Sequence, residues 1–255
     1  ILQYINAVMC IDLSISYSSL SMFKKSPLEY FFAKIIKEPP EKINSSYGDA
    51  GSAVHKALDT YLKNGNSDKV FEEQIKKVDL HGIHGETLNI QKFRDCYEKG
   101  KKIIDEFRAD GYTLVPEMKI EYTTNVLDTK LKVVGYIDVV AKKGEEVIIL
   151  DWKTNSSVPE DGFIGQQEFY TYLYYTKFKK LPKTFIWYML KNGNKLERQF
   201  GLDTVKKIET EIENFVKYIN DRGTDVELYD EGNYEHIFNE HFTSCRNESM
   251  KRKKT

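Results

Sequence analysis

The stretch that decides the fold is Gly135-Tyr-Ile-Asp-Val-Val-Ala-Lys-Lys-Gly-Glu-Glu-Val-Ile-Ile-Leu-Asp-Trp-Lys153. Two runs rich in β-branched residues flank Gly144-Glu145, a pattern that predicts two antiparallel strands joined by a tight turn. With Gly144-Glu145 as the turn, Asp138 lies directly opposite Asp151, and the Cβ atoms of such a pair are about 4.5–5.5 Å apart. A turn at Lys143-Gly144 would shift this register, so the pairing is a hypothesis at this stage.

The predicted hairpin offers a site for a cation. Two carboxylates at that separation repel each other, and a cation between them removes the repulsion. Strand side chains alternate, so Lys153 shares the face of Asp151, while Leu150 and Trp152 point to the opposite face. Oxygen ligands suit Mg²⁺ or Mn²⁺ rather than structural zinc. The Asp-x-Lys triplet alone is weak evidence, because Asp128-Thr-Lys130 has the same form and a solvated strand end explains either triplet.

Polar residues on two predicted helices extend the pattern. Gln166 and Tyr170 are four residues apart and share one face of a helix predicted over 162–178. His55 lies on a helix predicted over 51–62, beside an apolar stripe. Taken singly, the tyrosine fits a half-buried amphipathic helix and the histidine fits a buried, hydrogen-bonded imidazole. One shared site is favoured by the combination of four motifs: His55, Gly135-x-x-Asp138, Asp151-x-Lys153 and Gln166-x-x-x-Tyr170.

The remaining sequence predicts a mixed α/β protein with a helical cover. Helices are predicted within 16–35 and over 51–62, 88–110, 162–178 and 205–219, and strands over 113–124, 131–141, 147–152, 184–190 and 196–200. We expect one domain over residues 1–255. Its helical N-terminal part covers about 14–110, its sheet core about 111–200, and its C-terminal helix and mobile basic tail about 201–255.

Composition narrows the class of protein. The 255 residues are 40% hydrophobic and 30% charged, which fits a folded globular chain, and the net charge of −1 excludes a polycation that coats nucleic acid. Apolar runs such as 147–150 are far shorter than the roughly 18 residues of a membrane span, so no membrane partner is expected. Cys10, Cys96 and Cys245 favour a reducing, cytoplasmic compartment, and residues 1–11 lack the features of a signal peptide.

The motifs resemble, in their order along residues 13–190, the PD-(D/E)xK nuclease superfamily, and in particular its RecB-like nuclease and exonuclease branch. The stretches that carry the resemblance are Leu13-Ser-Ile-Ser-Tyr-Ser-Ser-Leu20, Ser26-Pro-Leu-Glu-Tyr-Phe-Phe32, Gly48-Asp-Ala-Gly-Ser-Ala-Val-His55-Lys-Ala-Leu58, Gly135-Tyr-Ile-Asp138, Asp151-Trp-Lys153-Thr154 and Gln166 to Tyr170. The resemblance implies a restriction-endonuclease-like central mixed sheet flanked by helices. It also implies divalent-metal-dependent hydrolysis of DNA phosphodiester bonds, as an exonuclease in DNA processing, recombination or repair.

The resemblance also assigns residue roles. Asp138, Asp151 and Lys153 are implied to be catalytic, and Gln166 and Tyr170 to contact nucleic acid. The implied ligands of Mg²⁺ or Mn²⁺ are His55, Asp138, Asp151 and the backbone carbonyl of Trp152. Whether Glu117 or Glu121 joins the site stays open at this stage.

One motif departs from the RecB-like pattern. Several relatives hold an iron–sulfur cluster, but Ser26 stands where their N-terminal cysteine is expected, and the C-terminal part has only Cys245. We therefore expect no iron–sulfur cluster. The expected partner is single- or double-stranded DNA, with a helicase or recombination protein as a further candidate. The alternatives are a non-catalytic nucleic-acid-binding subunit of a nuclease/helicase complex, and a structural α/β domain with chance triplets.

Overall fold

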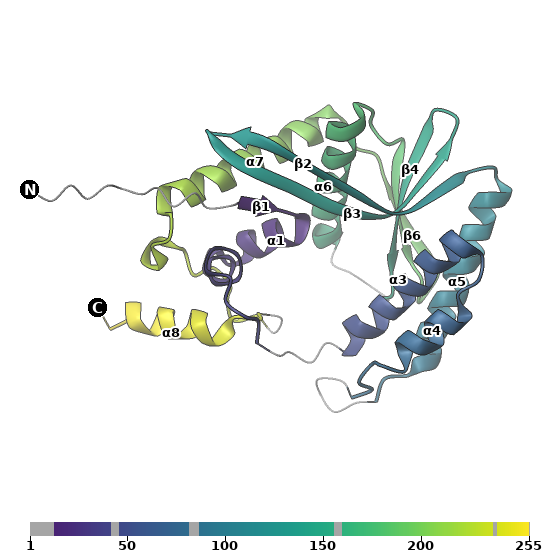
Figure 1. The fold of residues 1–255 in the computed structure, drawn as a ribbon, viewed down its shortest axis with the longest axis horizontal. Coiled ribbons are helices and arrows are strands. Elements are labelled where there is room, and N and C mark those ends of the chain that lie inside the picture. The colour runs from purple at the N-terminus through teal and green to yellow at the C-terminus, as the bar shows by residue number, and fades with distance from the viewer. Residues whose placement is uncertain (1–12, 42–45, 82–86, 156–159, 237–238, 255) are drawn as a thin grey trace, which may run out of the picture. The chain divides into compact units, whose positions relative to one another are not determined.

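The computed structural model describes residues 13–41, 46–81, 87–155, 160–236 and 239–254 (Figure 1). Cys10, the segment 1–11 and part of the predicted loop 37–46 fall outside these ranges. The chain divides into two compact units, each built from separate stretches of sequence. The central unit comprises residues 44–120 and 135–209, and the terminal unit comprises residues 1–43, 121–134 and 210–255. The expectation of one nuclease domain stays a prediction.

The predicted helices and strands are all present in the described structure. The strands are β1 (Leu13–Ile15), β2 (Thr113–Val126), β3 (Thr129–Lys143), β4 (Glu146–Lys153), β5 (Thr184–Met189) and β6 (Asn194–Arg198). The helices are α1 (Tyr17–Lys25), α2 (Pro27–Tyr30), η1 (Phe31–Ile36), α3 (Ser46–Asn64), α4 (Asp68–Ile75), α5 (Ile90–Ala109), α6 (Glu160–Phe178), α7 (Leu202–Arg222), η2 (Val226–Leu228) and α8 (Phe242–Arg252). The structure thus adds the strand β1 and the helices α4, η2 and α8, which were not predicted.

The sheet of the central unit is mixed. The second half of β3 pairs antiparallel with β4, β4 pairs parallel with β5, and β5 pairs antiparallel with β6. Strand β4 is buried along almost its whole length, which explains its continuous apolar run from Val147 to Leu150. The observed architecture is therefore the expected central mixed sheet flanked by helices.

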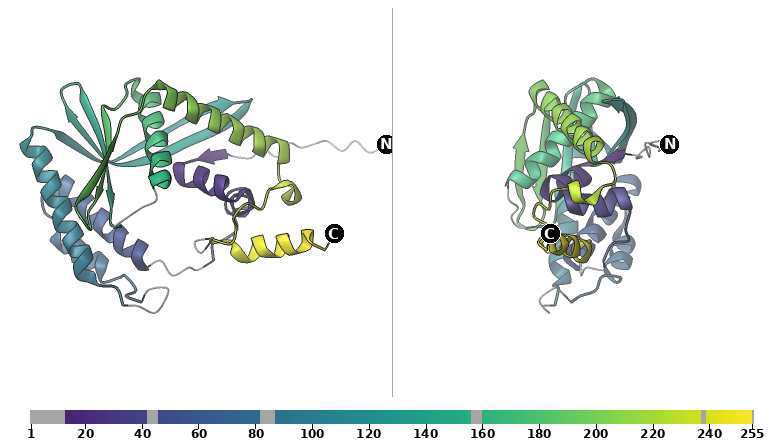
Figure 2. Two further views of the ribbon diagram at one scale, coloured as in Figure 1. Left: turned by 180° about the vertical axis from the view of Figure 1, so that it is seen from behind. Right: turned by 90° about the vertical axis from the view of Figure 1, so that its left-hand side faces the viewer.

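Helices cover both faces of this sheet. Ile186 of β5 belongs to the apolar cluster that α3, α4 and α5 build with β3 and β4. The preceding residue, Phe185, stacks on Tyr170 of α6 with ring centroids 6.4 Å apart. Successive strand residues point to opposite faces, so α6 lies on the face opposite α3 and α5. The view from behind in Figure 2 shows α6 crossing the sheet, with α3, α4 and α5 grouped on its other side.

The terminal unit is organised around short capped helices. Ser16 caps α1 through a reciprocal pair of hydrogen bonds with Ser19. The ring of Phe23 meets those of Tyr30, Phe215 and Tyr218 edge-on, at centroid distances of 5.7, 5.0 and 4.9 Å. In the same unit β1 pairs in parallel with the first part of β3. A strand of three residues is too short to be predicted from alternation.

Ser26 acts as a hydrogen-bonding group at the start of α2. Its hydroxyl accepts from the backbone N–H of Glu29 at 3.1 Å and donates to the carbonyl of Glu231 at 2.6 Å. Cys245 is fully buried in the same unit, and burial raises the pKa of its thiol to about 11. Ser26 therefore fastens α2 to the C-terminal segment. The expectation that no iron–sulfur cluster is bound stays a prediction.

Lys251 and Arg252 of the predicted basic tail are helical, and the mobility of the tail stays a prediction. These residues form the last turn of α8, and the guanidinium of Arg252 donates to the carbonyls of Tyr229 and Val226 at 2.7 and 2.5 Å. The charge of this segment does not reveal that these backbone carbonyls are within reach. Within the described residues, no helix combines the length and the apolar character needed to cross a membrane.

Candidate active site

The hairpin register brings the two aspartates together. Lys143 pairs with Glu146, and Val139 pairs with Leu150. The next position of this ladder sets Asp138 opposite Asp151, so the turn at residues 144–145 is confirmed. The backbone N–H of Trp152 donates to Asp138 Oδ2 at 3.1 Å, which ties the carboxylate to the neighbouring strand.

Helix α3 places His55 beside the first of these carboxylates. The apolar neighbours of His55 on α3, Val54 and Leu58, are fully buried against the sheet, so the position of the helix is fixed by packing. The imidazole is on the rim of this core, with its side chain 35% exposed, and its Nδ1 lies 3.2 Å from Asp138 Oδ2. His55 therefore belongs to the site.

Lys153 connects the second carboxylate to α6. Its ammonium lies 2.5 Å from Asp151 Oδ1 and donates to Gln166 Oε1 at 2.9 Å. The amide nitrogen of Gln166 donates in turn to the hydroxyl of Tyr170 at 3.3 Å. Two strands and two helices of the central unit thus contribute to one continuous polar cluster. Every site residue singled out in the sequence reaches this cluster, although Trp152 does so through its N–H, and ligation by its carbonyl stays a prediction.

The pKa values of the cluster are strongly perturbed. Burial raises the pKa of Asp138, but the charge of His55 and the N–H of Trp152 outweigh it, so the net shift is downward. Burial and the charge of Asp138 raise the pKa of Asp151 to about 6, against the opposing effect of Lys153. Burial lowers the pKa of His55, yet Asp138 outweighs it and the net shift is upward from 6.5. Asp151 therefore keeps its proton to a higher pH than a free aspartate does, and His55 keeps its proton to a higher pH than a free histidine does.

The chemistry of this donor set fits a hard divalent cation. The side chain of Asp151 is only 3% exposed, and within the described residues its Oδ1 receives no well-aligned hydrogen bond despite the nearby ammonium. A buried carboxylate with poor hydrogen bonding is costly, and a bound cation removes that cost. Within the described ranges, no group of three His, Cys, Asp or Glu side chains lies close enough together to hold a metal ion. A cation must therefore compete with the proton of His55 and the ammonium of Lys153 for these carboxylates.

Other charged residues considered from the sequence lie elsewhere. Glu117 is half exposed, with its carboxylate 3.5 Å from the ammonium of Lys63. Glu121 belongs to the terminal unit, where its carboxylate lies 3.1 Å from Lys132. Participation of either glutamate stays open. Lys180, which follows α6, forms an ion pair with Glu145 of the β3–β4 turn.

Two glycines of the motifs have structural roles that the sequence left unassigned. A Cβ atom on Gly135 would lie 2.3 Å from Leu173 Cδ1, so this glycine lets α6 approach β3. A Cβ atom on Gly51 would lie 2.9 Å from Thr154 Oγ1, so that glycine lets α3 approach the end of β4. A glycine inside a strand or helix pattern often marks such a close approach, which is the signal that could have identified both.

Comparison with known proteins decides the family. A sequence model of the PD-(D/E)XK nuclease superfamily matches residues 14–248. The chain belongs to the PD-(D/E)XK nuclease superfamily. No curated protein sequence matches it. Membership supports a nuclease, and a nuclease acts on nucleic acid.

Solved structures support the fold. The crystal structure of a candidate exonuclease from Eubacterium rectale aligns with a TM-score of 0.52 at 12% identity, covering 93% of this chain and 88% of that chain. A second structure, of a protein named SSO0001, aligns with a TM-score of 0.33 at 9% identity over 72% of this chain and 82% of that one. At 12% identity, the first likeness establishes the shared architecture alone.

Proposed function

We propose that this member of the PD-(D/E)XK superfamily is a divalent-metal-dependent deoxyribonuclease that acts as an exonuclease in DNA processing, recombination or repair. The observation that carries the proposal is the single polar cluster of the central unit. In it Asp138 and Asp151 face each other across a hairpin, with Lys153 2.5 Å from the second carboxylate. A non-catalytic binding subunit would have no need of a complete set of these groups.

The side chains divide the chemistry between them. Asp138 and Asp151, with His55 as an imidazole ligand, are the groups that would hold Mg²⁺ or Mn²⁺. An ion held by these groups would supply positive charge that lowers the pKa of a bound water molecule and neutralises charge on the phosphoryl oxygens. Lys153, held by Gln166, places a fixed positive charge where negative charge develops in the transition state. Tyr170 keeps the amide of Gln166 oriented.

His55 must lose its proton before it can act as a ligand. Asp138 stabilises the imidazolium, so the metal-free site holds this proton to a higher pH than a free histidine does. Binding of the ion therefore releases protons and strengthens as the pH rises. In the metal-free cluster, the proton of His55 and the ammonium of Lys153 thus offset the negative charge of the two carboxylates.

A cleavage assay on three forms of one DNA tests the proposal. Purified protein with Mg²⁺ or Mn²⁺ is incubated with linear duplex, closed circular duplex and single-stranded DNA. An exonuclease degrades the linear forms and spares the circle, whereas cutting of the circle contradicts the exonuclease assignment. Binding without cleavage of any form, with either metal, favours the non-catalytic subunit. Substituting RNA of the same sequence tests the choice of DNA.

A further inference from the structure

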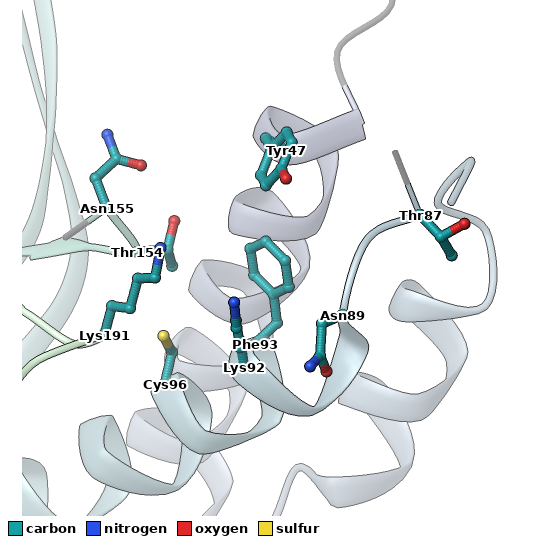
Figure 3. A pocket seen from close by; sticks show the side chains of 9 residues that line it. All are labelled: Tyr47, Thr87, Asn89, Lys92, Phe93, Cys96, Thr154, Asn155 and Lys191. Atoms are coloured by element: carbon teal, nitrogen blue, oxygen red, sulfur yellow. The ribbon is translucent and has the colours of Figure 1, made fainter. Parts of the chain in front are cut away.

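A pocket with a volume of about 340 Å³ opens beside the cluster, between α3, α5 and the segments that follow β4 and β5 (Figure 3). Its lining includes Tyr47, Lys92, Phe93, Thr154, Asn155 and Lys191. Thr154 and Asn155 directly follow Lys153, and Tyr47 lies on the helix that carries His55. The elements that position the catalytic cluster therefore also line this pocket, although none of the cluster residues lines it.

An exposed aromatic ring lies at the pocket. Tyr47 is 54% exposed. Its ring centroid lies 6.4 Å from that of Phe93, which is 7% exposed and belongs to the apolar core. A solvent-facing ring supported by a buried one is a suitable surface on which a planar base can stack.

The charge of the lining favours an anion. Lys92 and Lys191 contribute two ammonium groups, and no Asp or Glu is among the described residues of the lining. The segment that carries Lys191 is fastened to α5, because Lys99 donates to the Lys191 carbonyl at 2.9 Å. Thr154 and Asn155 add a hydroxyl and an amide, which can hydrogen-bond to a base or a sugar. Figure 3 shows Thr154, Asn155 and Lys191 on one side, facing Tyr47 and Phe93 on the other.

We propose that this pocket binds one unpaired nucleotide of single-stranded DNA, with its base stacked on Tyr47 and a phosphate held by Lys92 and Lys191. The inference rests on the proposed function, because the nucleotide in the pocket would belong to the same DNA strand that the cluster cleaves. A volume of about 340 Å³ is near the lower end for small-ligand pockets, which suits one nucleotide. A base in a duplex is stacked and paired, so only an unpaired base can enter.

Binding measured without metal separates this inference from catalysis. The whole chain is titrated in EDTA against a short fluorescent oligo(dT), and the anisotropy gives Kd. Tyr47→Ala should weaken binding about tenfold, because one base–aromatic stack is lost, while Tyr47→Phe should retain the wild-type Kd. Phe178→Ala is the matched control, since Phe178 is also an exposed aromatic residue, 42% exposed, and does not line the pocket.

The salt dependence tests the phosphate contact. Lys191→Gln should reduce the slope of log K against log salt concentration by about 0.7, the value for one lost contact on a single strand. Lys102→Gln is the control, because Lys102 is 80% exposed on α5 and lies outside the pocket. Both lysine variants leave the apolar core untouched, and thermal melting verifies that each variant is folded.

The outcomes distinguish the pocket from the proposed function. The nucleotide pocket is overturned if Tyr47→Ala and the wild type have equal Kd values for single-stranded DNA. It is also overturned if Tyr47→Ala loses the same affinity for a blunt duplex as for single-stranded DNA. Both results count even where the wild type cleaves DNA with Mn²⁺. Tyr47-dependent binding by a wild-type protein that cleaves nothing supports the pocket and overturns the proposed nuclease. A wild type that binds no single-stranded DNA overturns the pocket.

Discussion

Replacing Asp151 with asparagine should stabilise the metal-free protein. Burial and the charge of Asp138 raise the pKa of Asp151 from 3.8 to about 6, so folding disfavours its charged form. Each pKa unit corresponds to about 1.4 kcal/mol, which gives an upper limit of about 3 kcal/mol at pH 7 for removing the charge. In a chain of 255 residues, an increase of this size in the free energy of unfolding raises Tm by roughly 5 °C.

The pH dependence of this gain has a definite direction. Below about pH 4 the carboxyl of Asp151 is protonated in the folded and the unfolded chain, so the variant and the wild type should be equally stable. Between about pH 4 and pH 6 the unfolded chain releases this proton first, and the wild type loses stability relative to Asp151→Asn. Above about pH 6 the difference stays constant. Thermal melts in EDTA across this range measure it.

Manganese should reverse the order of stability. An ion at a concentration 1,000-fold above its Kd stabilises a folded protein by about 4.1 kcal/mol. This exceeds the upper limit of about 3 kcal/mol that Asp151→Asn gains in the metal-free protein, and the variant should forfeit the stabilisation by the ion. Asp128→Asn is the matched control, because Asp128 belongs to the same kind of Asp-x-Lys triplet but lies exposed at a turn. If Asp151→Asn melts below the wild type in EDTA at pH 7, Asp151 stabilises the metal-free fold and the reasoning is refuted.

Three further substitutions probe separate parts of the account. Lys153→Ala should lower kcat by roughly 10²–10³-fold, as for loss of one preorganised donor. The Mn²⁺ affinity measured by calorimetry should be retained or increased, because the ammonium no longer competes for Asp151; a parallel loss of affinity would contradict an electrostatic role. His55→Gln should weaken Mn²⁺ binding, and the expected increase of binding above pH 6.5 should become smaller, while the increase near pH 6 that comes from Asp151 remains; full activity with a lowered Tm would make His55 a packing residue. Gly135→Ala should lower the free energy of unfolding by about 1–3 kcal/mol, because the added methyl group overpacks against Leu173. Urea denaturation measures this change, and a midpoint and an m-value equal to those of the wild type would contradict it.

The hairpin could be predicted because its information is local. The apolar runs 139–141 and 147–150 predict two strands, and the Gly144-Glu145 turn predicts one of the two registers that the sequence left open. The structure has that register. Gln166 and Tyr170 could be paired by helical spacing alone. Their contact with Lys153 depends on how α6 packs on the sheet, so helical spacing could not reveal it.

Contacts between distant segments could not be predicted from one sequence. The approach of His55 to Asp138 depends on the packing of α3 against β3 and β4, which no local pattern encodes. The same holds for the pocket, because Tyr47 and Lys191 are separated by most of the central unit in sequence. Helix α4 (Asp68–Ile75) was also missed, since eight residues span little more than two turns.

The most direct test of the proposed function is the rate at which Mn²⁺ and the purified protein release nucleotides from linear DNA. We expect the wild type to release nucleotides and EDTA to abolish this release. Asp138→Ala and Asp151→Asn, which thermal melting must first show to be folded, should release no nucleotides above background. Asp128→Asn should cleave at the wild-type rate. Undiminished release by either site variant would contradict the assignment of the paired aspartates as the catalytic metal site.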